Sequence, residues 1–240
     1  KDWRASDELT DDPRWPGYEV PPTGNANYGW ILHMVSKLSE NGVAGFILAN
    51  GALSGDGQEK AIRKKLIENG LVEAVMILPR NMFYTTDISV TLWILNKNRN
   101  ARTVKRADVT RDYRDREDKI LFVDLRQWGE PFEKKYIQFS DEHRAKITET
   151  FHCWQETRAE SDYEDVPDYC SSATLDEVQA KDYSLVPSKY IEFINRDENI
   201  DFDEKMKALQ SEFSELLREE ESSKISLLKV FKELGYEIEL

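Results

Sequence analysis

Five basic side chains within one short stretch of the sequence could bind the phosphate groups of a nucleic acid. They are Lys97, Arg99, Arg102, Lys105 and Arg106, and no acidic residue lies among them. The whole chain carries a formal net charge of −13. It is therefore not expected to coat nucleic acid along its entire surface, and any contact with phosphate must be local. The alternative is that this stretch forms the solvated tip of a hairpin.

Two aromatic residues, Phe83 and Tyr84, lie in a short polar connection between two apolar runs of the chain. Such a connection is expected at the surface, where a large aromatic ring exposes apolar area to water unless something covers it. The two rings therefore either pack under the edge of a sheet or contact a molecule outside the chain.

The other residues with familiar chemistry do not have the spacing of a site. The three histidines are far apart, and the only cysteines, Cys153 and Cys170, form no CxxC pair. We expect neither a metal site nor a disulfide framework, and interpret these side chains as structural. No apolar stretch reaches the ~18 residues that a membrane-spanning helix needs, so we expect a cytoplasmic protein that does not enter the membrane.

The elements that must position the basic and aromatic residues follow from hydrophobic periodicity. Apolar residues at helical spacing predict a helix over residues 30–38, and the continuous apolar run 43–49 predicts a strand that is buried on both faces. A second helix is expected to follow, with Asp56 and Glu59 as its capping box and with Gly70 as its end.

Two further apolar runs, 71–78 and 88–95, predict strands on either side of the connection that carries Phe83. A strand, a helix and a strand in succession imply that 43–49 and 71–78 run parallel through a right-handed crossover. The next connection is too short for a helix, which favours an antiparallel pairing of 88–95 with the strand before it. The chain is therefore expected to be α/β, with half of a sheet in which strand 43–49 lacks a natural neighbour.

The end of the chain has a different pattern. Met206, Leu209, Phe213 and Leu216 repeat at three- and four-residue steps, and a similar apolar set resumes further on, which predicts two helices or one broken helix. The narrow apolar face is typical of a seam between helices. It is expected to be covered either by a partner or by the chain's own middle region.

The order of these elements resembles the second half of the catalytic domain in the modification subunit of type I restriction-modification systems. The motifs that carry the resemblance are "VAGFILA", "GAL", "IRKKL", "LPRNMF" and "LWILNK", with weaker echoes at "ILFVDLRQWG" and "YSLVPSKYIEF". The resemblance implies the C-terminal half of a Rossmann-like methyltransferase sheet, with two parallel strands and one antiparallel strand, over residues 1–97. A mixed α/β middle segment would follow over 98–191, and a helical tail over 192–240.

The resemblance also implies a function, the transfer of a methyl group from S-adenosylmethionine to an adenine that is flipped out of duplex DNA. Phe83 matches the position of an aromatic residue that stacks on the flipped base, and Tyr84 is a weaker second candidate. The implied partners are double-stranded DNA, a DNA-specificity subunit and a restriction subunit. The apolar face of the tail would contact the specificity subunit.

Two defining motifs of that family are absent, namely the Asn-Pro-Pro-Phe tetrapeptide and the Gly-rich loop that holds S-adenosylmethionine. We therefore expect that this chain alone has no cofactor-binding residues, binds no cofactor and is inactive. The alternative is a non-catalytic interaction module, for which assembly with a DNA-specificity subunit through the tail is the purpose.

Overall fold

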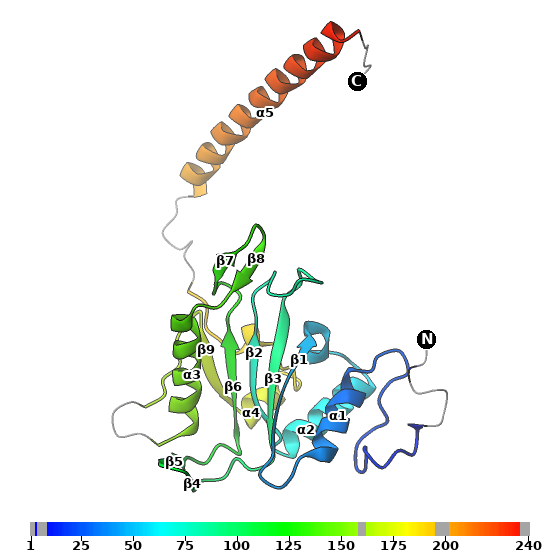
Figure 1. The fold of residues 1–240 in the computed structure, drawn as a ribbon, viewed down its shortest axis with the longest axis vertical. Coiled ribbons are helices and arrows are strands. Elements are labelled where there is room, and N and C mark those ends of the chain that lie inside the picture. Colours follow the sequence, from blue (N-terminus) through cyan, green and yellow to red (C-terminus); the bar gives the residue numbers. More distant parts are fainter. Residues whose placement is uncertain (1–2, 4–8, 158–161, 195–201, 236–240) are drawn as a thin grey trace. The chain divides into compact units, whose positions relative to one another are not determined.

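The computed structural model describes the chain except for residues 1–2, 4–8, 158–161, 195–201 and 236–240 (Figure 1). It consists of two compact units, residues 1–193 and residues 194–240. The first unit contains every strand of the described chain, and the second contains one long helix.

Five strands of the first unit form one mixed sheet with the spatial order β1-β3-β2-β6-β9. They are β1 (Val43–Ala49), β2 (Val72–Ile77), β3 (Val90–Asn96), β6 (Lys119–Asp124) and β9 (Cys170–Thr174). β2 and β6 pair in parallel, whereas the other neighbouring strands pair antiparallel. The predicted antiparallel strand is confirmed. It lies between β1 and β2, which run in the same direction without pairing.

Helices cover both faces of this sheet, and each face has its own core. The first core joins the sheet to α1 (Asn27–Lys37), α2 (Gln58–Glu68) and α4 (Leu175–Ala180). The second core joins it to α3 (Asp141–Gln155) through Trp154, with Ile147 and Phe151 packed against it. Neighbouring residues of β6 alternate between the two cores, as expected of a strand buried on both faces.

Short elements complete the first unit. They are the 3-10 turns η2 (Asn50–Leu53) and η3 (Pro187–Lys189), the hairpin of β4 (Arg102–Arg106) and β5 (Val109–Tyr113), and the hairpin of β7 (Glu130–Phe132) and β8 (Tyr136–Gln138). The two hairpins lie at opposite ends of the sheet (Figure 1).

Strand β1 differs from its prediction. Its side chains alternate between exposed and half-buried, and Val43 and Ile47 are 55% and 46% exposed. The expectation of burial on both faces is therefore wrong. One face packs against the first core through Ala44, Phe46 and Leu48. No described element covers the other face, and no described strand pairs with the outer edge of β1.

The start of α2 also differs, whereas its end agrees. Gly57, with φ +60, is the N-cap and no side chain caps the helix, so the predicted capping box of Asp56 and Glu59 is wrong. At the other end Gly70 has φ +66. Its N–H bonds to Ile67 O at 2.9 Å, while Leu71 N–H bonds to Leu66 O at 3.0 Å. This is the Schellman pattern that glycine favours.

The expected boundary at residue 97 does not separate two compact units. Strands β6 and β9 come from the segment 98–191, and they extend the same sheet that β1, β2 and β3 begin. The second expected boundary, at residue 191, lies close to the division at residue 193.

The second unit contains α5 (Phe202–Glu233), a single continuous helix of 32 residues. The prediction of two helices or a broken helix is therefore wrong. The serines that interrupt the apolar pattern have only mildly unfavourable helix propensity, and the stretch has no glycine or proline. None of its described residues is buried. Charged residues occur along its whole length, and no helix in the described ranges is apolar enough to span a membrane.

Candidate functional site

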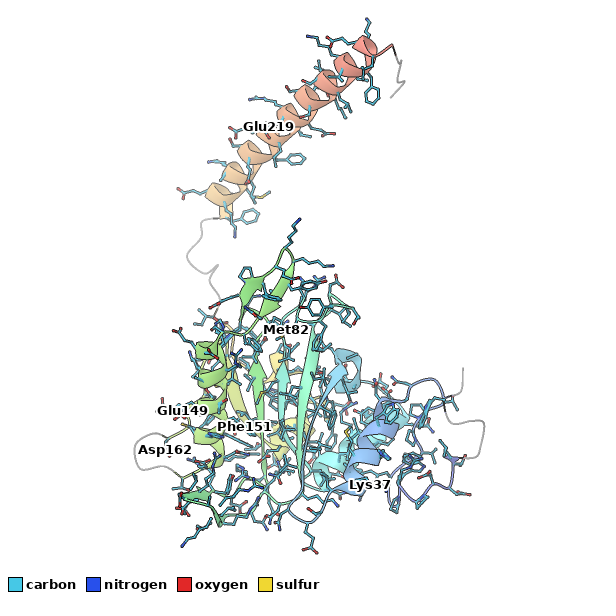
Figure 2. The ribbon with its side chains drawn as sticks, viewed as in Figure 1. Lys37, Met82, Glu149, Phe151, Asp162 and Glu219 are labelled. Carbon is cyan, nitrogen blue, oxygen red and sulfur yellow. The ribbon has the colours of Figure 1, made fainter. Side chains whose placement is uncertain are left out.

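The connection between β2 and β3 holds its two aromatic residues in different environments. Phe83 is half-buried and packs against the second core, as does its neighbour Met82, which Figure 2 labels near the end of the sheet. Tyr84 is 69% exposed. An ion pair between Arg80 and Asp87, 3.1 Å long, joins the two ends of the connection. The two predicted environments therefore apply to different residues. Phe83 packs partly against the core, whereas Tyr84 projects into solvent, where it could contact another molecule.

A hollow of about 460 Å³ opens beside these two rings. Its lining consists of Asn81, Phe83, Tyr84, Thr85, Thr86, Asp87, Lys135 and Tyr136. The last two residues belong to the β7–β8 hairpin, so the hollow lies between two loops that are distant in sequence. Aromatic faces next to hydroxyl and amide groups suit a flat, polar ligand such as a nucleobase.

Sequence reasoning missed the contribution of the β7–β8 hairpin. The sequence could have indicated this contribution only through strand pairing. β2 and β6 are parallel, and the loops that follow parallel strands meet at one edge of a sheet. The pairing of residue 77 with residue 124 brings the hairpin after β6 next to the connection after β2. The aromatic ring of Tyr136 then comes within 4.7 Å of the ring of Tyr84, centroid to centroid.

Arg99 does not bind a ligand in solvent. Its side chain is 1% exposed, and its guanidinium donates to the carbonyl oxygens of Val72 at 2.7 Å, of Lys119 at 2.8 Å and of Glu117. Burial lowers the pKa of Arg99 to about 10, which still leaves it charged at neutral pH. The prediction that Arg99 contacts DNA is wrong, because its donors hold strand ends together.

The other four basic residues lie on or beside the β4–β5 hairpin. Lys97 donates to Leu38 O at 2.9 Å, and the guanidinium of Arg102 lies 5.2 Å from the ring centre of Tyr113. Lys105 and Arg106 are exposed on β4 and form no ion pair within the described ranges. Lys97 is exposed too, but its ammonium group is engaged with a backbone carbonyl, so Lys105 and Arg106 are the better candidates for contact with a ligand.

The structure does not bring the basic stretch and the aromatic connection together. The β4–β5 hairpin lies at one end of the sheet, where Arg99 meets the start of β2. The connection with Phe83 and the β7–β8 hairpin lie at the other end, where β2 finishes (Figure 1). Any contact with one ligand would therefore have to reach across the length of the sheet.

The histidines take part in local packing. His143 belongs to the capping box that starts α3, and His152 lies 3.1 Å from a guanidinium nitrogen of Arg111. Among the described residues, no three His, Cys, Asp or Glu side chains cluster closely enough to hold a metal ion.

The apolar side chains of α5 form a heptad pattern. Met206, Leu209, Phe213 and Leu216 are between 43% and 63% exposed and follow one another at alternating steps of three and four. Two polar residues, at 220 and 223, interrupt the pattern, which Leu227 and Val230 resume in the same register. An exposed stripe of this kind is typical of a helix that packs on another helix.

Known proteins resemble this chain in sequence and in fold. The sequence of residues 1–199 matches the family model described as N-6 DNA methylase. The chain belongs to the N-6 DNA methylase family.

Curated members of the family that are similar to this chain are methylase subunits of type I restriction enzymes. The HindI subunit of Haemophilus influenzae is 35% identical over 239 residues, which are 99% of this chain and 49% of the relative. The MjaIX subunit of Methanocaldococcus jannaschii is 33% identical over 239 residues, which are 98% of this chain and 40% of the relative. The chain thus spans about half the length of these relatives or less.

Solved structures agree with this assignment of the chain to the family. The methyltransferase subunit of a type I restriction-modification system from Streptococcus thermophilus matches with a TM-score of 0.65 and 28% identity, over 81% of this chain and 36% of that one. The EcoKI M protein matches with a TM-score of 0.51 and 18% identity, over 86% and 47%, and shows the fold alone. The mixed α/β sheet is therefore of the type I methyltransferase kind, and the resemblance seen in the sequence is confirmed.

Proposed function

We propose that this chain supplies the C-terminal part of a type I modification subunit, which methylates the exocyclic amino group of adenine in duplex DNA. The observation that carries the proposal is the hollow beside Phe83, in a member of the N-6 DNA methylase family. The amino group of a paired adenine is out of reach inside the stack, so the base must leave the helix before the methyl group is transferred.

In this proposal Phe83 supplies one face of the pocket for the flipped adenine. Its ring is fixed on one side by the second core and borders the hollow on the other. Stacking on an aromatic ring stabilises a base by ~1–3 kcal/mol, which offsets much of the cost of unstacking it. Tyr84 projects beside the same hollow and is a weaker candidate for the base contact.

The rest of a Rossmann-like sheet would join at β1. This strand is apolar, pairs only with β3 in the described chain and leaves a row of backbone donors and acceptors at its outer edge. Such an edge is unfavourable unless another strand or a loop covers it. We infer that a segment outside these residues pairs there and brings the cofactor site.

The residues of this chain do not fit S-adenosylmethionine by themselves. The loop after β1 is filled by its own side chains: Ala52 and Leu53 are buried, and a side-chain carbon on Gly55 would lie 1.8 Å from the carboxylate of Glu59. Arg63 closes the loop by donating to Gly55 O at 2.8 Å. The proposal therefore includes no cofactor-binding residue here, and the chain alone is inactive.

The proposed partners follow from the same assignment. Double-stranded DNA is the substrate, and a DNA-specificity subunit and a restriction subunit complete a cytoplasmic enzyme. The exposed apolar face of α5, with Met206, Leu209, Phe213 and Leu216, supports a contact with the specificity subunit. The same exposed face favours the second candidate function, a non-catalytic module whose purpose is assembly.

A chimera tests the proposal. The segment of the HindI methylase subunit that matches this chain is replaced by the present residues, and the chimera is combined with its specificity subunit. Transfer of a labelled methyl group from S-adenosylmethionine to adenine in DNA is then measured. Activity supports the catalytic function, whereas a chimera that folds and assembles without methylating DNA leaves the assembly module as the function.

A further inference from the structure

The β7–β8 hairpin carries basic and aromatic side chains to which the proposed function gives no role, although Lys135 and Tyr136 line the hollow. Its turn contains the exposed residues Lys134 and Lys135, followed by Tyr136. Neither lysine forms an ion pair within the part of the chain that the structure describes. The ammonium group of Lys135 lies 5.1 Å from the ring centre of Tyr136.

The hairpin is fixed against the connection that carries Phe83. The backbone N–H of Ile137 donates to Asn81 O at 3.0 Å. Gly129, just before the hairpin, has φ +109, and a side-chain carbon there would lie 2.4 Å from the Ile137 side chain. Glycine allows this close return of the chain within the hairpin. The bond from Ile137 to Asn81 joins the hairpin to the connection, and residues of both line the rim of the hollow.

Both aromatic rings of this rim keep part of their surface in contact with solvent, and Tyr136 is half-buried. Tyr84 and Tyr136 meet edge to face, with ring centres 4.7 Å apart and an angle of 71° between the planes. Tyr84 is 69% exposed. Burial contributes little to the stability of so exposed a ring, so this pair presents an aromatic surface beside two cations at the mouth of the hollow.

We infer that Tyr136, Lys134 and Lys135 form a second DNA contact, which holds an unpaired base and the phosphates next to it while the adenine is flipped. This inference rests on the proposed function. Flipping leaves the opposite base without a partner, and any base can stack on an aromatic ring because each has a π face. The lysines would bind the neighbouring phosphates without reading sequence.

The test uses the whole 240-residue chain and short fluorescein-labelled duplexes, one fully paired and one with a single unpaired thymine. Binding is followed by fluorescence anisotropy without cofactor. The unpaired duplex should bind at least about fivefold more tightly, as expected for one stacked base. Tyr136→Ala should remove this preference, Tyr136→Phe should keep it, and the double change Lys134→Ala with Lys135→Ala should weaken binding to both duplexes.

A matched control lies elsewhere on the surface. The ammonium of Lys64 is also 5.1 Å from a tyrosine ring, that of Tyr183, and Lys64→Ala should leave both affinities unchanged. Equal binding of both duplexes, wild-type affinity in the Tyr136→Ala variant, or no binding by the wild-type chain would each overturn the inference. The assay involves no methyl transfer. An inactive chimera with Tyr136-dependent DNA binding would therefore count against the proposed function alone.

Discussion

Glu73 shows how a single buried residue ties the first unit together. Its carboxylate accepts hydrogen bonds from Arg116 at 3.0 and 3.2 Å, from Gln155 at 3.1 Å and from Asn96 at 2.9 Å. Glu73 and Arg116 are 0% and 1% exposed. These contacts connect β2 to the end of β3, to the segment before β6 and to the end of α3.

Removing this carboxylate should destabilise the fold strongly. Glu73→Ala leaves the guanidinium of Arg116 buried without a counter-charge, and we expect a loss of ~3–5 kcal/mol in the free energy of unfolding. Urea denaturation measures it. The matched control is Glu68→Ala, which removes the exposed pair with Lys64 and should cost less than ~1 kcal/mol. Equal losses for the two variants would contradict this account.

Phe83 permits a test of base stacking at the same scale. In the active chimera, Phe83→Leu should keep the packing against the second core but lose the aromatic face. We expect methylation of duplex DNA to fall by about 5- to 150-fold, with the affinity for S-adenosylmethionine nearly unchanged. Phe83→Tyr is the control and should retain most activity. If cofactor affinity falls while base flipping, read by 2-aminopurine fluorescence, is intact, Phe83 is only a core residue.

At the scale of an element, the β4–β5 hairpin carries exposed basic residues, whereas Arg99 just before it is buried. Replacing Lys105 and Arg106 by Ala should weaken binding of the assembled enzyme to specific and random DNA alike, because phosphate contacts carry no sequence information. The slope of log affinity against log salt should shrink by roughly 0.9 for each phosphate that the enzyme no longer neutralises.

The comparison variant for this hairpin is Arg99→Ala. Because the described hydrogen bonds of the Arg99 guanidinium go to backbone carbonyls of its own chain, loss of this side chain should lower the thermal midpoint rather than change the salt dependence of binding. If the slope is unchanged after Lys105 and Arg106 are replaced, the hairpin is a solvated tip.

At the scale of the whole molecule, the tail can be separated from the sheet by mutation. Leu209 and Phe213 are 50% and 63% exposed on α5. Changing both to Ser should abolish co-purification with the specificity subunit and barely move the thermal midpoint of this chain. Lys207→Ser with Arg218→Ser, on the opposite side of the helix by its 3.6-residue period, is the control and should keep the partner bound.

The opposite outcome would assign the tail to the core of its own chain. If the stripe packs on residues 98–190, the Leu209 and Phe213 changes should cost ~2–5 kcal/mol per large side chain. A sharp fall in the midpoint with the partner still bound would refute assembly through this face.

A second prediction for the whole molecule concerns the cofactor. Because the loop after β1 is filled by its own side chains, the isolated chain should release no measurable heat when titrated with S-adenosylmethionine. The active chimera is the positive control. A micromolar site on the isolated chain would show that the cofactor contacts lie within these residues.

Hydrophobic pattern in the sequence was enough to place the first elements of the sheet. The apolar runs predicted β1, β2 and β3, and the helical spacing predicted α1, because the side-chain period of a strand or helix is a local property. Gly70 marked the end of α2 because the left-handed conformation there favours glycine. Motif order also indicated the family, which the similarity to known proteins confirms.

How those elements combine follows only from the folded chain. Strand order depends on pairing between distant segments, so β3 could not be placed between β1 and β2 from local pattern. As a basic residue in a basic stretch, Arg99 was predicted to bind DNA phosphate. In the folded chain its guanidinium instead binds the carbonyls of Val72, Glu117 and Lys119, which are distant in sequence. The contact between the rings of Tyr136 and Tyr84 likewise forms only when the chain folds, because the two residues are distant in sequence. Local pattern fixes the type of an element, whereas long-range packing determines which side chains meet.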